Sequence, residues 1–233
     1  MRTHVVSGAG SGIGAVLAGR LHERGDELWL LARSEERAVE LEKAHPGART
    51  LVADLADPAG LEGALVVASL PERVDSLLHV AGVVDLEPVA ELDLGHWQRQ
   101  LDVNLTSPAV LTRALLPALR AAGGTVVFVN SGAGLAANPT WSGYAASKFG
   151  LRALADALRA EELEHGVRVT TVYPGRTATP MQEKVHAQEG REYDAARWSD
   201  AATVADTILH VVDLPADSTI PDVTVRPAPA RGS

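Results

Sequence analysis

Residues 7–14 of this 233-residue chain are Ser7-Gly8-Ala9-Gly10-Ser11-Gly12-Ile13-Gly14. An apolar run at residues 3–7 leads into them, and a helical pattern with Leu17 and Leu21 follows. Glycine allows a tight turn and a close approach to the main chain, and the free N–H groups at the start of a helix attract an anion. The order of strand, glycine-rich turn and helix therefore predicts a turn that binds a pyrophosphate. A flexible connection without a ligand is the alternative.

Strand-like apolar runs recur along the chain and alternate with helical patterns. They lie at residues 3–7, 27–31, 48–52, 76–80, 125–130, 167–173 and 219–225. Strands joined by helical crossovers form a parallel sheet that is covered on both sides. We therefore expect an α/β fold, namely a Rossmann-like three-layer, doubly wound sandwich with a seven-stranded, mainly parallel sheet. Residues 1–225 would form this single domain, and residues 226–233, rich in Pro, Ala and Arg, would form a flexible tail.

The composition excludes several classes of protein and site. The net charge is −9 with scattered Lys and Arg, which argues against binding to nucleic acid or to an anionic membrane. The chain has no Cys, so disulfides, thiolate metal ligands and a Cys nucleophile are excluded, and we expect no metal site. No run approaches the roughly 20 apolar residues of a membrane span, and no signal-peptide pattern opens the chain. We expect a cytoplasmic protein.

A second motif, Tyr144-Ala145-Ala146-Ser147-Lys148, pairs a phenol with an ammonium group. A spacing of four residues places both on one face of a helix. A free phenol has a pKa of about 10. A positive charge about 4 Å away, at an effective dielectric constant of about 20, favours the phenolate by roughly 4 kcal/mol, or about three pKa units. The motif therefore predicts a phenol that exchanges protons near neutral pH, although such a pattern alone is more often an ordinary helix surface.

Together the two motifs resemble the T-G-x-x-x-G-x-G and Y-x-x-x-K signatures of the short-chain dehydrogenase/reductase family, with Ser7 in place of the usual Thr. The resemblance covers nearly the whole chain and implies hydride transfer between a nicotinamide dinucleotide and a small carbonyl or secondary alcohol. It implies a catalytic tetrad of Asn104, Ser131, Tyr144 and Lys148. Ser131, thirteen positions before Tyr144, would bond the substrate oxygen, and the Asn104 carbonyl would hold a water linked to the lysine. A strand-end serine and a helix-end asparagine are the alternatives.

The resemblance also implies a set of cofactor-binding residues. They are Gly8, Gly10, Ser11, Gly12, Ile13, Gly14, Arg33, Ser34, Asp54, Leu55, Ala81, Gly82, Tyr144, Lys148, Pro174, Gly175, Thr177 and Thr179. The resemblance implies that Asp54 accepts a hydrogen bond from the adenine amino group. Helix capping is the alternative role for Asp54, but Asp57 before Pro58 already looks like the cap, which leaves Asp54 free. Thr177 and Thr179 would hold the carboxamide.

One position departs from the family pattern. His79 stands where the family carries an asparagine, in His79-Val80-Ala81-Gly82. We interpret His79 as a buried, hydrogen-bonded sheet residue rather than a second acid or base.

The choice of dinucleotide depends on the end of the second strand. NAD-binding sites commonly carry an acid about 20 residues beyond the glycines. In this chain that position, nineteen residues past Gly14, is Arg33, whose guanidinium suits a 2′-phosphate. We therefore expect NADP(H) to be favoured over NAD(H). Ser11, where many NADP-preferring relatives carry Lys or Arg, and the neighbouring Glu35 and Glu36 argue the other way.

The sequence says less about the substrate and the oligomeric state than about the cofactor. The resemblance places the pocket in residues 132–143 and 181–198, where Leu135, Trp141 and Met181 indicate a partly apolar site. No cationic clamp for a carboxylate emerges, so we expect an uncharged or weakly polar ketone, aldehyde or secondary alcohol. The helix at residues 109–119 is apolar around more than one side, which favours a homodimer or homotetramer. A dehydratase or epimerase reaction, and a catalytically silent dinucleotide-binding sensor or scaffold, remain as alternatives.

Overall fold

Seven parallel strands form the central sheet of the computed structural model, which describes residues 1–228. The strands are β1 (Thr3–Ser7), β2 (Glu27–Ala32), β3 (Arg49–Val52), β4 (Ser76–His79), β5 (Thr125–Val129), β6 (Arg168–Pro174) and β9 (Asp222–Val225). They lie in the order β3-β2-β1-β4-β5-β6-β9, and each neighbouring pair is parallel. The predicted Rossmann-like α/β fold with a seven-stranded sheet is confirmed.

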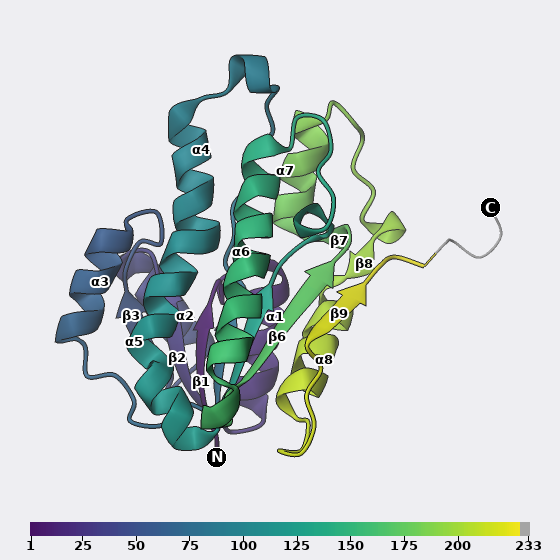
Figure 1. Cartoon of the computed structure of the whole chain (residues 1–233). Coiled ribbons are helices and arrows are strands. Elements are labelled where there is room, and N and C mark those ends of the chain that lie inside the picture. The colour runs from purple at the N-terminus through teal and green to yellow at the C-terminus, as the bar shows by residue number, and fades with distance from the viewer. Residues whose placement is uncertain (229–233) are drawn as a thin grey trace.

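Helices cover both faces of this sheet (Figure 1). One layer contains α1 (Gly12–Glu23), α2 (Glu35–Ala44) and α8 (Ala201–Val212), and the other contains α3 (Pro58–Val67), α5 (Ser107–Ala122) and α6 (Ser142–Glu161). Helix α4 (Leu94–Leu101) continues into α5 through a π-helical turn, Asp102–Thr106. Helix α7 (Pro180–Gln188) follows the short strand β7 (Thr177–Ala178), which pairs with β8 (Ser199–Asp200). Within residues 1–228, no helix has both the length and the apolar character needed to cross a lipid bilayer.

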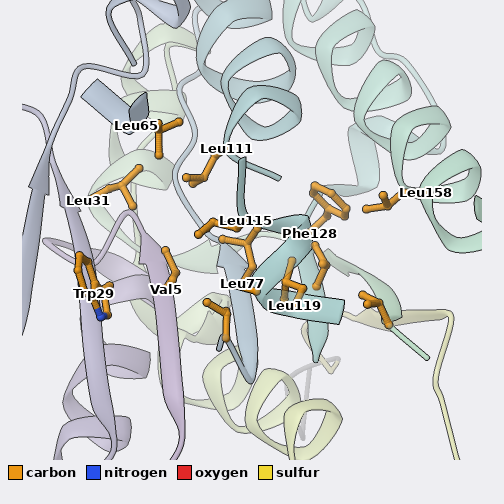
Figure 2. Close-up of a cluster of buried hydrophobic side chains, with 14 of the residues drawn as sticks. Val5, Trp29, Leu31, Leu65, Leu77, Leu111, Leu115, Leu119, Phe128 and Leu158 are labelled. Carbon is orange, nitrogen blue, oxygen red and sulfur yellow. The ribbon is translucent and has the colours of Figure 1, made fainter. Parts of the chain in front are cut away.

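Two apolar cores hold the three layers together. Val5 packs into the core on the side of α3, α5 and α6, and the next residue, Val6, packs into the core on the side of α1, α2 and α8. Figure 2 shows the first core, where Leu111 and Leu115 of α5 lie near Phe128 of β5. Each buried leucine contributes about 1.5–3 kcal/mol relative to exposure. The alternation of side chains along each strand thus attaches helices to both faces.

The last strand begins later than the sequence predicts, at Asp222 instead of residue 219. Pro221 has no N–H group, so it cannot donate a ladder hydrogen bond. Its carbonyl oxygen accepts from the Thr171 amide at 2.9 Å, which starts the pairing with β6.

Part of the predicted tail lies against the body of the protein. Pro227 packs near Gly175, where an added Cβ would lie 3.0 Å from its Cδ. Residues 229–233 of the predicted tail lie outside the described residues.

His79 is the buried sheet residue that the sequence predicts. Its Nε2 lies 2.8 Å from the Thr112 hydroxyl, and its ring stacks on Phe128 with 4.8 Å between centroids. Burial lowers the pKa of His79 to about 3, and the charge of Lys148 acts in the same direction. The imidazole is therefore neutral at physiological pH and joins β4 to α5.

Candidate active site

A cavity of about 820 Å³ lies at the carboxyl ends of the parallel strands. Residues that follow six successive strands line it, namely Gly8, Arg33, Asp54, Ala81, Ser131 and Gly175. Parallel strands bring their carboxyl ends to one edge of the sheet, which is where open α/β folds bind ligands. The volume of the cavity is within the range of small-molecule and cofactor sites.

Most of the predicted site residues line this cavity. They are Gly8, Gly10, Ser11, Gly12, Ile13, Gly14, Arg33, Asp54, Leu55, Ala81, Gly82, Ser131, Trp141, Tyr144, Lys148, Pro174, Gly175, Thr177, Thr179 and Met181. Three predicted residues are not among the lining residues. Ser34 caps α2 through the Arg37 amide, Asn104 lies behind the cavity wall, and Leu135 is 38% exposed at the surface.

The glycine-rich turn is packed too closely to accept side chains at two of its positions. Gly8 has a φ of +78°, and a Cβ there would lie 2.6 Å from the Ala81 amide nitrogen. A Cβ on Gly14 would lie 2.1 Å from the Gly8 carbonyl oxygen. The Ser11 side chain does not cap α1, so the amide groups of the first turn remain available to an anion. This cradle of backbone donors fits the pyrophosphate of a dinucleotide.

Tyr144 and Lys148 both lie on α6 and are almost fully buried, with 7% and 3% of each residue exposed. Lys148 Nζ donates to the Val129 carbonyl at 3.0 Å and lies 5.8 Å from the centroid of the Tyr144 ring. Burial lowers the pKa of Lys148 to about 8. Burial also raises the pKa of Tyr144, and hydrogen bonding with Ser131 partly opposes that rise.

The sequence prediction of a lowered phenol pKa is therefore wrong for this geometry. It placed an ammonium group about 4 Å from the phenol and counted only their attraction. In the structure Nζ bonds to the end of β5, and desolvation is the largest cause of the shift in the Tyr144 pKa.

Asn130, which the sequence analysis did not single out, connects the end of β5 to α6. Its Nδ2 donates to the Lys148 carbonyl at 3.0 Å, and its Oδ1 accepts from the Ser131 amide at 2.8 Å. Ser131 Oγ accepts from the Ala133 amide at 3.1 Å, which leaves the hydroxyl proton free for another acceptor. The signal in the sequence is a polar side chain that ends an apolar strand and precedes the predicted serine.

Asn104 lies in the π-helical turn between α4 and α5. Its side-chain amide bonds both to the main chain of Val83, at 2.8 and 2.9 Å, and to the Ser147 hydroxyl at 3.0 Å. Ser147 Oγ in turn donates to the Tyr144 carbonyl at 2.7 Å. Asn104 thus positions the loop after β4 against the first turn of α6, and the predicted water on its carbonyl stays a prediction.

A second arginine lies beside Arg33 at the end of the cavity near β2. Arg37, on the first turn of α2, lines the cavity, donates to the Gly10 carbonyl at 3.4 Å and pairs with Glu40. The sequence signal for Arg37 is that it follows Arg33 by four residues. Asp54 uses one carboxylate oxygen to accept from the Ala56 amide at 2.9 Å.

The end of the cavity beyond β6 is built from Pro174, Gly175, Thr177 and Thr179. Thr177 Oγ1 donates to the Gly175 carbonyl at 3.1 Å, and Thr179 Oγ1 donates to the Thr177 carbonyl at 3.2 Å. The Thr179 hydroxyl oxygen also accepts from the Gln182 amide at 3.3 Å and caps α7. These bonds hold the segment rigid.

The charge of the cavity opposes that of the whole protein. Its lining includes the cationic residues Arg33, Arg37, Arg99, Lys148, Arg176 and Arg226, whereas Asp54 supplies an acidic group. The predicted site residues did not include Arg37, Arg99, Arg176 and Arg226, which lie in separate parts of the chain. The cavity suits an anionic ligand even though the net charge of the chain is −9.

Comparison with known proteins gives consistent matches. A family model described as short chain dehydrogenase matches residues 2–190. An uncharacterized oxidoreductase of Staphylococcus epidermidis is 27% identical over 226 residues, which is 96% of each chain. D-beta-hydroxybutyrate dehydrogenase of Rhizobium meliloti is 32% identical over 200 residues, 82% of this chain and 77% of that protein. A solved short-chain dehydrogenase from Sphingobium yanoikuyae in complex with NADPH is 27% identical with a TM-score of 0.78, covering 95% of this chain and 87% of that one.

Replacing Gly14 by alanine should weaken NADPH binding at least about tenfold, because the new Cβ would force the Gly8 carbonyl out of place. Gly19→Ala is the matched control: it lies on the same helix, and its Cβ would meet no atom within 4 Å. The control should bind NADPH as the wild type does and gain about 0.5–1 kcal/mol in stability. Fluorescence titration and thermal unfolding measure both effects. Equal NADPH affinity for wild type and Gly14→Ala would contradict the assignment of the glycine-rich turn as the dinucleotide site.

Proposed function

The chain belongs to the short-chain dehydrogenase/reductase family, and we propose that it is an NADP(H)-dependent oxidoreductase that acts on a small carbonyl or secondary alcohol. One observation carries the proposal. Ser131, Tyr144 and Lys148 converge in the same cavity as the glycine-rich turn. An acid/base set beside a dinucleotide cradle is the arrangement that this chemistry requires.

The bound nicotinamide would supply or accept the hydride. The Ser131 hydroxyl, which hydrogen-bonds with Tyr144, would turn its proton toward the substrate oxygen when substrate binds. Tyr144 Oη would give its proton to that oxygen in reduction and take it back in oxidation. Because burial raises the pKa of Tyr144, the phenol is kept protonated, which suits reduction.

Lys148 would assist through its charge. With a pKa of about 8, its ammonium group is mostly protonated at pH 7 and favours the transient phenolate electrostatically. Its bond to the Val129 carbonyl holds this charge beside the Tyr144 ring. Asn104 and Asn130 would position Tyr144 and Lys148, since each asparagine side chain bonds to a residue of α6.

Tyr144→Phe should lower kcat by about three orders of magnitude and leave NADPH affinity nearly intact, because it removes the proton donor alone. NADPH oxidation with a panel of ketones and quinones measures this. Tyr173→Phe is the matched control, since Tyr173 is equally buried, its hydroxyl has no partner among the described residues, and it does not line the cavity. A wild-type protein that binds NADPH and reduces nothing would favour a dinucleotide sensor instead.

The preference for NADP(H) is supported by Arg33 and Arg37 together at one end of the cavity. Two guanidinium groups match a 2′-phosphate, each charge-assisted bond contributing about 1.5–3 kcal/mol. The double variant Arg33→Ala/Arg37→Ala should therefore lower kcat/KM for NADPH about 100-fold more than for NADH. Arg113→Ala, an exposed arginine that does not line the cavity, serves as control. A wild-type protein that used NADH better than NADPH would overturn the preference.

We further propose that two or four copies assemble through α5 and α6 and that the protein works in the cytoplasm. Val110, Ala114 and Leu116 of α5 are partly buried apolar residues, and Phe149 of α6 is exposed. Pairing of these helices between copies would bury this apolar surface. A monomeric mass in light scattering at micromolar concentration would contradict the assembly.

A further inference from the structure

We propose that Arg99 recognises a carboxylate on the substrate, so that the preferred substrates are oxo acids and the corresponding hydroxy acids. This inference rests on the proposed function and names its substrate class. It also replaces the sequence expectation of an uncharged substrate. Arg99 lies on α4 and lines the cavity, where the amide side chains of Asn138 and Gln182 also line the wall.

Arg99 belongs to the end of the cavity that contains Tyr144. The neighbouring Gln100 bonds to the Asp85 amide, in the loop after β4, at 3.1 Å. Gln100 also lies against Gly143, where an added Cβ would be 2.7 Å from its Nε2. Gly143 directly precedes Tyr144 on α6, so α4 carries Arg99 alongside the catalytic end of that helix. Arg33 and Arg37 lie instead beyond β2, on the glycine-turn side of the sheet.

The positive charge of Arg99 is only partly balanced, because its ion-pair partner Asp85 also serves a second cation. Its nearest acidic partner is Asp85, whose Oδ2 lies 3.6 Å from Nη1, outside hydrogen-bond distance. Asp85 Oδ1 is already bonded to Lys184 Nζ at 2.5 Å, and Lys184 also donates to the Val84 carbonyl at 2.8 Å. Lys184 and Arg99 therefore share one carboxylate, and the three groups together carry a net positive charge. Among the described residues Arg99 makes no side-chain hydrogen bond, and its side chain is 48% exposed.

A carboxylate is the group that this arrangement fits. A guanidinium presents parallel N–H donors that match the two oxygens of a carboxylate. The cavity lining is partly apolar, through residues such as Trp141 and Val185, so a substrate that fills the cavity would displace water from the ion pair. A substrate held by Arg99 at one end would direct its carbonyl group to Ser131 and Tyr144.

The test compares each oxo acid with its own methyl ester, which keeps the carbonyl and removes the charge. The probes are 3-oxobutanoate, 4-oxopentanoate and their methyl esters, with NADPH oxidation as the readout. We expect the wild type to prefer at least one acid to its ester by tenfold or more in kcat/KM. In Arg99→Met this preference should fall close to one, mainly through KM, because a remote contact is made equally before and during hydride transfer.

Three further variants separate recognition from structural support. Arg99→Lys should retain part of the preference because it keeps the charge. Asp85→Asn should raise the preference, since it removes the carboxylate nearest to Arg99. Arg49→Met is the matched control, because Arg49 also faces a carboxylate at 3.7 Å but lies at the start of β3, away from the cavity. It should leave the preference unchanged.

Two results would overturn the inference while leaving the proposed function in place. One is reduction of the esters as fast as the acids by the wild type. The other is an equal loss for acids and esters in Arg99→Met, which would show a structural role. Reduction of neither acid nor ester would also overturn the inference, and the proposed function would fall with it only if no ketone or quinone of the panel were reduced.

Discussion

The buried ammonium group of Lys148 is the interaction on which the rest of the site depends. Burying a charged group is costly unless the group is hydrogen-bonded. The Lys148 ammonium group donates a hydrogen bond to the Val129 carbonyl at the end of β5. The bond joins α6 to β5 beside the cavity. Asn130, the next residue of the chain, bonds back to the Lys148 carbonyl and places Ser131 opposite Tyr144. One small polar network therefore holds β5, α6 and Ser131 in place.

Features that depend on neighbours in the sequence could be predicted. The apolar runs locate the strands to within a few residues, because a buried parallel strand must be apolar on both faces. The glycine spacing and the interval between Tyr144 and Lys148 identify the turn and the helix face, because both are local geometry. The late start of β9 follows from Pro221, whose missing N–H could have been noted from the sequence.

Features that depend on contacts between distant elements could not be predicted. Asn130 matters because it bonds to α6, and Arg99 matters because α4 lies against the start of the same helix. Both contacts join residues that are far apart in the sequence. The direction of the Tyr144 pKa shift also required the structure. Helical spacing gives the separation of the phenol and the ammonium group but not the amount of water that folding removes around them, and desolvation is the largest cause of the Tyr144 shift.

The contrast between the acidic protein and its basic cavity has a consequence for how ligands arrive. The protein as a whole, with a net charge of −9, repels an anion, while the cavity, lined by residues such as Arg33, Arg37 and Arg99, attracts it. A negatively charged molecule is thereby turned toward the opening during diffusion, before any contact is made. The capture rate depends on ionic strength, because dissolved salt shortens the range of this field to about 8 Å at physiological concentration.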